Sequence, residues 1–339
     1  DGDNPSSIVD IFGSKATTIP RIQGDKGVRL TCQDPQGQPL TAQEVYAKVN
    51  PSVVTVVSEQ ADGASIGTGV IMTSDGYIIT NAHVISGGKS CWVALDTGVT
   101  YDVKLVGYDE EEDLAVLKAD PQNPLPAAEF GNSDLVQVGD TAYAIGNPLG
   151  VELRGTMTNG IISAINRDMV YNGHSMTLLQ TNAAINEGNS GGPLINMYGQ
   201  VIGITNMKAL STGVEGIGFA IPTAVIRPIV NALLADGRVS GRVSIGITVG
   251  AISSAASDYY DLPEGLYISN VAEGSDAEKQ GIQSGDMLLA VNGKPVTTTY
   301  DVSAVKDGLQ VGDTVTLTIY RDGKTFDVKV KLVDTNDIS

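Results

Sequence analysis

Short apolar runs rich in Val, Ile and Thr, separated by turn residues, dominate the chain from residue 52 to residue 222. Two sets follow each other: runs at 52–59, 67–84, 91–98, 100–109 and 113–120, then runs at 141–150, 155–166, 176–182, 193–207 and 216–222. Helix-length crossovers, which a parallel sheet would need, are absent within either set. The pattern therefore predicts a mostly β fold of two packed barrels with about six short strands each.

Helical patterns lie outside these runs. Residues 223–237 give the first clear amphipathic helix, and Gly237 stands where a C-terminal cap belongs. A shorter helix is predicted after Thr41, which forms a capping-box pair with Glu44. Beyond residue 243 the pattern predicts a small β-rich unit with two helices, at 275–281 and 300–309.

The chain therefore divides into three predicted parts. Residues 1–40 are polar, rich in Gly, Pro and Asp and without a sustained period, which predicts an N-terminal arm. Residues 41–237 contain both sets of strands and the helix that closes them, and residues 243–335 form the last domain. A length of 339 residues suits this division, because a single core rarely extends so far.

The charge of the chain excludes some classes of function. Lys and Arg total 21 against 39 Asp and Glu, a net charge of −18 that repels phosphate backbones, so nucleic-acid binding is not expected. No run of 18 apolar residues is present, and the opening residues DGDNPSSIVD lack the basic and apolar regions of a signal peptide. A leader, if the protein has one, is therefore expected to be missing from this sequence.

Cysteine and histidine are scarce. Cys32 and Cys91 leave two interpretations open, namely two unrelated buried thiols or a single disulfide formed in an oxidising compartment. The two histidines, His83 and His174, do not stand in HExxH spacing, and two cysteines are too few for a CxxC metal site. We therefore expect no metal and no other cofactor.

Three residues have the types and the order of a nucleophilic site. A serine hydroxyl needs an adjacent base, and the base needs an acceptor that orients it. His83 follows a strand in TNAHV, Asp113 begins an apolar strand after a charged loop, and Ser190 lies in EGNSGGPL. This is the chain order of the chymotrypsin triad. His174 lies between polar turn residues and is interpreted as a surface or hydrogen-bonded histidine.

The glycines around Ser190 suggest an oxyanion hole. When a carbonyl is attacked its oxygen becomes negative, and backbone N–H groups about 3 Å away lower the barrier. Gly188 and Ser190 can aim their N–H groups at one point only if the chain turns sharply between them. Gly191 and Gly192 are expected to keep side chains clear of the substrate.

The motifs TNAHV, DLAVLK, NAAINEGNSGGPL and GIGFAIP, followed by a terminal domain, resemble the HtrA family of serine proteases with a C-terminal PDZ domain. The resemblance covers roughly residues 41–335 and implies a chymotrypsin-like double β-barrel followed by a PDZ domain. It also implies that His83 is the general base, Asp113 orients it and Ser190 attacks, with the oxyanion bound by the N–H groups of Gly188 and Ser190.

The same resemblance implies a function and a location. Members of the family degrade unfolded or damaged proteins outside the cytoplasm without ATP, usually as trimers or multiples of trimers. We therefore expect an extracytoplasmic endopeptidase at the cell surface, in the periplasm or secreted, with anchoring by a segment outside this sequence as one option. The alternative is a chaperone or holdase in which the PDZ domain recruits peptides and little proteolysis occurs.

One position departs from the family. Glu187 stands where the family commonly has proline. Proline would fix φ in the oxyanion loop, whereas glutamate leaves φ free and brings negative charge near the developing oxyanion. The hypothesis is a loop that rests in an inactive conformation more readily than usual.

The positions of two segments in the sequence predict a pocket for the P1 side chain and a site for a peptide carboxylate. The primary specificity pocket of this fold is expected to have Ala184 and Ile185 at its floor and Ile217 in its wall, which favours an apolar P1 side chain such as Val, Ala or Leu. In the last domain, successive N–H groups in the segment VSIGI, those of residues Ile245, Gly246 and Ile247, are expected to bind the C-terminal carboxylate of a peptide that adds as a strand.

Overall fold

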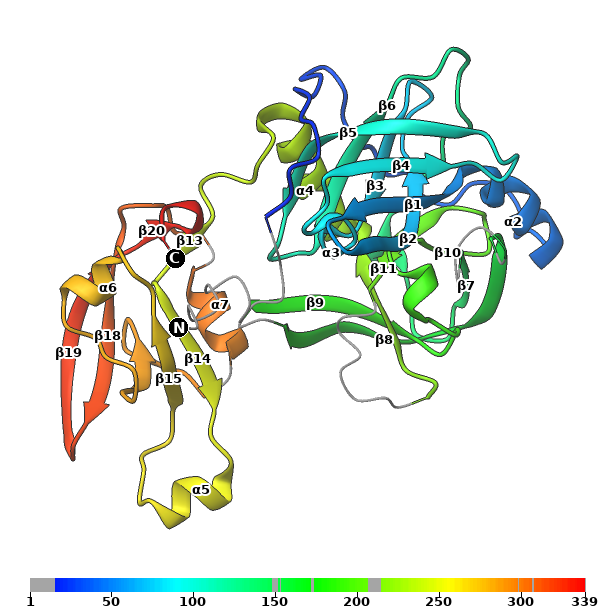
Figure 1. Ribbon diagram of the computed structural model, residues 1–339. Helices are drawn as coiled ribbons and strands as arrows, with labels where there is room; N and C mark the ends of the chain where they lie inside the picture. The colour runs from blue at the N-terminus through cyan, green and yellow to red at the C-terminus, as the bar shows by residue number, and fades with distance from the viewer. Residues whose placement is uncertain are drawn as a thin grey trace. The chain divides into compact units, whose positions relative to one another are not determined.

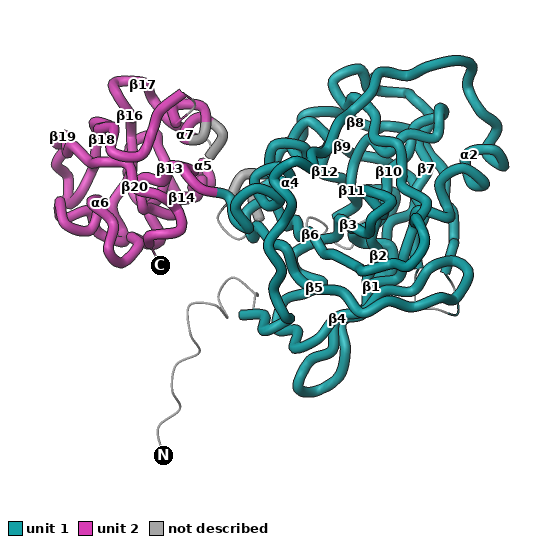
Figure 2. Tube along the Cα trace, turned by 90° about the horizontal axis from the view of Figure 1, so that it is seen from above, with its two compact units in different colours: residues 1–169, 176–239 teal, residues 170–175, 240–339 magenta. Residues whose placement is uncertain are grey.

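The computed structural model describes residues 16–147, 152, 154–171, 174–206, 215–297, 299–306 and 308–338. The chain divides into two compact units, one built from residues 1–169 and 176–239 and the other from residues 170–175 and 240–339 (Figure 2). The predicted limits of the arm, 1–40, and of the two domains, 41–237 and 243–335, are not tested by this division and stay predictions. Among the described residues, no helix is both long and apolar enough to cross a membrane.

Two closed barrels of six strands each build the first unit, which confirms the predicted double barrel (Figure 1). The first barrel, in the order β1-β2-β3-β6-β5-β4, consists of β1 (Val53–Gln60), β2 (Gly63–Ile71), β3 (Tyr77–Thr80), β4 (Ser90–Ala94), β5 (Thr100–Asp109) and β6 (Leu114–Ala119). The second, in the order β10-β11-β12-β9-β8-β7, consists of β7 (Thr141–Gly146), β8 (Thr156–Tyr171), β9 (His174–Thr181), β10 (Pro193–Ile195), β11 (Val201–Thr205) and β12 (Gly218–Pro222). Neighbouring strands of the first barrel are antiparallel, as are the pairs β7–β8, β7–β10, β10–β11, β11–β12 and β9–β12 of the second.

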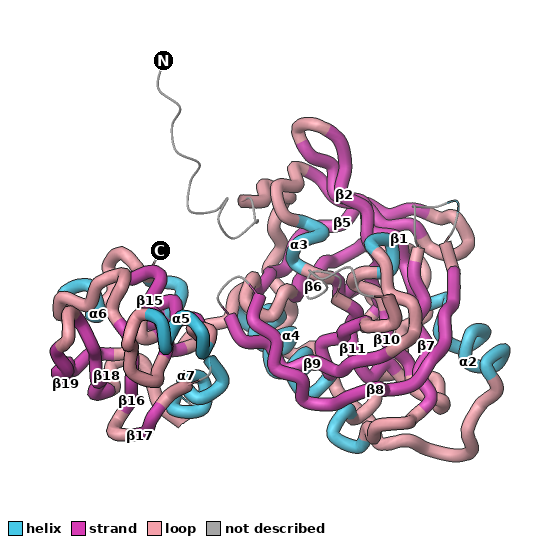
Figure 3. Tube along the Cα trace, turned by 90° about the horizontal axis from the view of Figure 1, so that it is seen from below, coloured by secondary structure: helices cyan, strands magenta, loops and turns pink. Residues whose placement is uncertain are grey.

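Helices occupy the outside of these barrels (Figure 3). The helix α2 (Ala42–Val49) begins with the predicted capping box of Thr41 and Glu44. The helix α4 (Thr223–Asp236) ends at Gly237, whose φ of 71° and N–H bond to Leu233 O confirm the predicted cap. The short helix α3 (Ala82–Ile85) directly follows β3.

The described part of the predicted arm, residues 16–40, docks on the first unit through backbone hydrogen bonds. Ile22 N donates to Leu105 O at 3.0 Å, and Leu105 N donates to Pro20 O at 2.9 Å. Ile19 is 2% exposed and joins the core of the first barrel. This segment therefore adds to an existing core and has no core of its own.

Both cysteines are free thiols, so the disulfide interpretation is wrong. Cys91 is buried in the core of the first barrel, where loss of hydration raises the pKa of its thiol to about 12. Cys32 lies on the docked segment beside Thr223 and Arg227 of α4, and its half-buried thiol also has a raised pKa, mainly through burial. The two thiols are packed against different elements, and this separation leaves each without a partner sulfur.

The second unit is built on a five-stranded path in the order β14-β15-β16-β18-β19, with β17 paired to β16 and a separate β13-β20 pair. Its strands are β13 (Val243–Ser244), β14 (Ile247–Ala251), β15 (Leu266–Val271), β16 (Met287–Val291), β17 (Lys294–Pro295), β18 (Thr314–Arg321), β19 (Lys324–Lys331) and β20 (Val333–Asp334). The predicted helices are present as α6 (Asp276–Lys279) and α7 (Thr299–Lys306). A third, α5 (Ser254–Tyr259), was not predicted, because its small and polar residues bury none of their side chains.

A buried ion pair fastens the sheet of the second unit. Asp286 is 2% exposed and accepts from Arg321 Nε at 2.6 Å and Nη2 at 2.7 Å. The bidentate contact raises the pKa of the Arg321 guanidinium. The pair joins the end of β18 to the start of β16.

Replacing Arg321 by Met should leave the Asp286 carboxylate buried without its cation. We expect the free energy of unfolding of the second unit to fall by about 2 kcal/mol, less than for a fully buried pair because the Arg321 side chain is 28% exposed. Hydrogen–deuterium exchange of peptides from residues 243–332 measures the loss, with Lys324→Ala, an exposed position at the start of β19, as the control. Equal protection in the two variants would contradict the role of the pair.

Candidate active site

Asp113 and His83 meet between β3 and β6. Asp113 lies in the turn before β6 with φ at +53°, and His83 lies in α3, directly after β3. The Asp113 carboxylate accepts from His83 N at 2.8 Å through Oδ1 and lies 2.6 Å from His83 Nδ1 through Oδ2. The carboxylate thus fixes both the backbone and the ring of the histidine. Asp113 tolerates this left-handed conformation because a short polar side chain is the least penalised there.

Two asparagines that the sequence did not single out hold this pair. Asn206 is 1% exposed and donates from Nδ2 to Asp113 Oδ2 at 3.0 Å. Asn81, fully buried at the start of α3, donates from Nδ2 to the Asp113 backbone carbonyl at 3.0 Å. Asn81 lies inside the motif TNAHV, and Asn206 directly follows β11. Residue type alone does not reveal that either asparagine contacts Asp113.

Ser190 completes the predicted constellation. Its Oγ lies 3.3 Å from His83 Nε2 and 2.8 Å from Asn81 Oδ1. Because a hydroxyl has one proton, the shorter contact makes Asn81 the better acceptor in this conformation. Ser190 is 1% exposed, and the side chain of His83 is 16% exposed. The imidazole therefore lies in line between the hydroxyl and the Asp113 carboxylate.

Barrel strands hold the loop before Ser190 through its carbonyl groups. Thr68 Oγ1 donates to Gly188 O at 2.7 Å, and Thr205 Oγ1 donates to Asn189 O at 2.6 Å. Thr68 belongs to the first barrel and Thr205 to the second. Both barrels thus contribute to the position of the nucleophile.

The glycines after Ser190 are packed against the barrels, and the predicted clearance of the substrate by Gly191 and Gly192 stays a prediction. A Cβ on Gly191 would lie 2.3 Å from Thr68 O, and one on Gly192 would lie 2.5 Å from Ile145 O. Gly191 also has φ at +88°, a region that favours glycine. The two residues are pressed against β2 and β7, and any side chain would push the loop off the barrels.

Residues Glu187–Asn189 form one 3-10 turn that ends at Ser190. Within it, Asn189 N donates to Asn186 O at 3.1 Å. An oxyanion hole needs the N–H groups of residues 188 and 190 to face the substrate. Gly188 and Ser190 stay predicted oxyanion donors.

The predicted specificity residues come together at the same end of the second barrel. Ala184 is exposed, and its carbonyl accepts from Asn189 Nδ2 at 3.1 Å. The Ile185 side chain lies against Gly218, where an added Cβ would be 2.6 Å from Ile185 Cγ1. Ile217 directly precedes Gly218 and is half-buried. The assignment of a P1 pocket to these residues stays a prediction.

The predicted carboxylate-binding segment of the second unit lies just before β14. Ile245 is 3% exposed and packs in the core of its unit, while Gly246 has φ at +82°. A Cβ on Gly246 would lie 2.4 Å from Ser275 Cβ, so only glycine fits there. The Gly246 N–H donates to Ser244 Oγ at 2.9 Å, which a ligand carboxylate would have to replace. Ile247 begins the strand.

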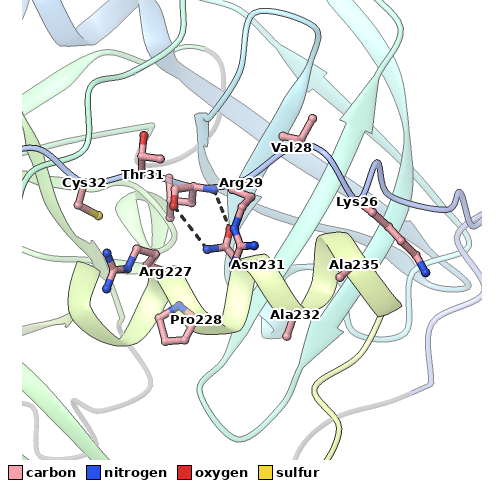
Figure 4. Close-up of a pocket in the computed structure, with 11 residues that line it drawn as sticks. Lys26, Val28, Arg29, Thr31, Cys32, Arg227, Pro228, Asn231, Ala232 and Ala235 are labelled. Carbon is pink, nitrogen blue, oxygen red and sulfur yellow. Dashed lines mark hydrogen bonds between the residues drawn. The ribbon is translucent and has the colours of Figure 1, made fainter.

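A pocket of about 710 Å³ lies away from these residues, between the docked N-terminal segment and α4 (Figure 4). Leu30 N donates to Asn231 Oδ1 at 2.7 Å across it, and Cys32 and Arg227 line one end. Its lining contains none of the residues of the Ser190 site, of the predicted P1 pocket or of the predicted carboxylate-binding segment. Within the described residues, no group of His, Cys, Asp and Glu is arranged to hold a metal ion. The side chain of His174 lies outside the described part of the chain.

Comparison with known proteins agrees with this geometry. Residues 67–204 match the family model described as a trypsin-like peptidase domain, and residues 243–332 match a PDZ domain. The chain is 42% identical over 283 residues to serine protease Do-like HtrA of Lactobacillus helveticus, covering 79% of this chain and 68% of that protein. It is 42% identical over 270 residues to a probable periplasmic serine endoprotease, DegP-like, of Chlamydia trachomatis, covering 78% and 53%.

A solved structure, the serine endoprotease from Yersinia pestis, matches with a TM-score of 0.67 and 35% identity over 88% of this chain and 99% of that one. The fold and site thus define a trypsin-like peptidase joined to a PDZ domain. The chain belongs to the HtrA family of serine proteases. It spans 68% of the length of the Lactobacillus relative and 53% of the length of the Chlamydia relative.

The 3-10 turn leads to a test of Glu187. Asn186 before it is extended, with φ of −140° and ψ of 175°, which is the conformation that proline demands of the preceding residue. Glu187→Pro should therefore be tolerated. Because proline fixes φ at residue 187 and the negative charge is lost, the substitution should raise kcat/KM on a peptide substrate several-fold. Glu187→Gln removes the charge alone and separates the two causes. Unchanged activity in Glu187→Pro would contradict the hypothesis.

Proposed function

We propose that this chain is a serine endopeptidase that cleaves unfolded or damaged proteins without ATP. The observation that carries the proposal is the alignment of Ser190 Oγ, the His83 ring and the Asp113 carboxylate, with separations of 3.3 Å and 2.6 Å. Nucleophile, base and orienting acid stand in the order that acyl transfer requires. Membership of the HtrA family supports the choice of protein substrates.

The chemistry follows from these atoms. For attack, the Ser190 hydroxyl exchanges Asn81 Oδ1 for His83 Nε2 as its acceptor. His83 takes the proton as Oγ bonds to the carbonyl carbon, and Asp113 stabilises the imidazolium that forms. The negative oxygen is bound by the N–H groups of Gly188 and Ser190. His83 then protonates the leaving amine, and water releases the acyl group by the same path.

The apolar surroundings of Ile185 and Ile217 favour a P1 side chain such as Val, Ala or Leu, because no charge stands at the floor to bind a cationic one. The charge of −18 disfavours nucleic acid as a partner. We further propose an extracytoplasmic location, which the periplasmic relative supports, and assembly as a trimer or a multiple of a trimer, which the family resemblance supports.

A binding-only chaperone is the alternative, and the site disfavours it. A holdase has no use for a buried carboxylate that fixes both the backbone and the ring of one histidine beside a serine. The positive φ of Asp113 adds a backbone cost that binding of unfolded chains would not require.

The second unit is proposed to bind peptide C-termini. In the described sheet, β14 is an edge strand with β15 on one side, and α7 packs beside it. An extended peptide can add to this edge while its carboxylate meets the N–H groups of Ile245, Gly246 and Ile247. We propose apolar C-terminal residues as ligands, because Ile247 and Val249 of β14 are partly buried apolar residues that pack on the core of the unit.

Degradation of β-casein tests the endopeptidase. We expect Ser190→Ala to abolish cleavage and Asp113→Asn to lower turnover by about 10⁴-fold, because the asparagine stabilises the wrong tautomer of the histidine. Glu111→Gln, in the charged loop before Asp113, is the matched control and should cleave like the wild type. Cleavage that persists in Ser190→Ala would refute the assignment.

Binding of a pentapeptide ending in valine tests the second unit, measured by fluorescence anisotropy on the full chain carrying Ser190→Ala. We expect amidation of the peptide C-terminus to weaken binding at least tenfold, because the backbone N–H groups then lose their anionic partner. An amidated peptide that binds as tightly as the free acid would rule out carboxylate recognition.

A further inference from the structure

The connection between β14 and β15 carries two tyrosines with no role in any core. Tyr259 is 81% exposed and Tyr260 is 68% exposed, although both lie at the end of an ordered helix, α5. Their rings contact each other edge to face, with centroids 4.9 Å apart and an interplanar angle of 86°. Exposed aromatic pairs of this kind are typical of recognition surfaces.

The connection is held in shape by its own hydrogen bonds and not by burial. Ser253 Oγ accepts from Ala256 N at 3.2 Å and caps the helix, and no residue of α5 is buried. Leu262 N donates to Ser257 O at 2.9 Å, and Ser257 Oγ donates to Leu262 O at 3.0 Å. The tyrosines are thus presented on a locally ordered support, which lowers the entropy cost of binding through them.

The charged side chains of this connection are all negative. Residues 252–265 contain Asp258, Asp261 and Glu264, all exposed, and no Lys or Arg. A cation near the rings would therefore meet both negative carboxylates and the electron-rich faces of two tyrosines.

The part of a bound peptide that would reach α5 follows from the direction in which the peptide runs along β14. If the carboxylate sits at the start of β14, the ligand has to run back along the strand towards Ala251, antiparallel to it. The strand Ile247–Ala251 pairs with about five ligand residues. Ala251 is paired with Leu266, so α5 lies beyond the end of both strands, as Figure 1 shows. Residues upstream of the fifth position of the ligand would therefore meet the α5 connection.

We propose that Tyr259 and Tyr260, with Asp258, Asp261 and Glu264, form a second subsite that binds Lys or Arg located six to eight residues from the C-terminus of the peptide ligand. The subsite rests on the proposed binding of C-termini to β14 and extends it to longer ligands. It gives the unit a preference for basic tails over short or acidic ones.

Three peptides test the subsite on the full chain carrying Ser190→Ala: a pentapeptide ending in valine, a decapeptide with the same last five residues and Lys-Arg at the sixth and seventh positions, and its Glu-Glu counterpart. We expect the basic decapeptide to bind roughly three- to tenfold tighter than the pentapeptide, and the acidic one no tighter than the pentapeptide. Tyr259→Ala with Tyr260→Ala should remove the gain and leave pentapeptide binding unchanged. Tyr259→Phe with Tyr260→Phe should keep most of it.

The outcomes separate the two claims. Equal affinity for all three peptides in the chain that keeps both tyrosines, or a gain that survives the double alanine variant, overturns the subsite while binding at β14 stands. Failure of every peptide to bind overturns both. Unchanged affinity for the pentapeptide in the double alanine variant also shows that the unit has kept its fold.

Discussion

The buried carboxylate of Asp113 is the point on which the site depends. It accepts from the His83 backbone, lies against the His83 ring and accepts from Asn206, and it does so at 3% exposure. A carboxylate that has lost its hydration is stable only when such donors replace the lost water. Removing any one of these donors leaves the buried carboxylate with an unsatisfied acceptor, so hydrogen bonds as well as packing fix the position of the His83 ring.

The nucleophile depends on both barrels at once. Thr68 of the first barrel and Thr205 of the second bind neighbouring carbonyls of the loop before Ser190, and Gly191 lies against the backbone of β2. The histidine and the aspartate, by contrast, come from the first barrel alone. Closing the two barrels against each other therefore brings Ser190 to His83.

The sequence was sufficient for the parts of the fold that have local signals. Short apolar runs separated by turn residues predicted both barrels, and the capping signals at Thr41 and Gly237 were confirmed. It was insufficient where the cause is a contact between distant residues. Asn81 and Asn206 are 125 positions apart, and only the folded chain shows that both serve Asp113. The helix α5 escaped prediction for a different reason, because it is held by local hydrogen bonds and leaves no hydrophobic pattern. The disulfide failed because spacing carries no information on where the two thiols pack.

The central claim is that His83 activates the Ser190 hydroxyl, and covalent capture by a fluorophosphonate probe tests it most directly. Mass spectrometry of the labelled and digested protein should place one adduct on the peptide containing Ser190. Labelling should become far slower in His83→Ala, while His174→Ala should label like the wild type. An adduct on another residue, or capture at Ser190 that is equally fast without the His83 imidazole, would contradict the account.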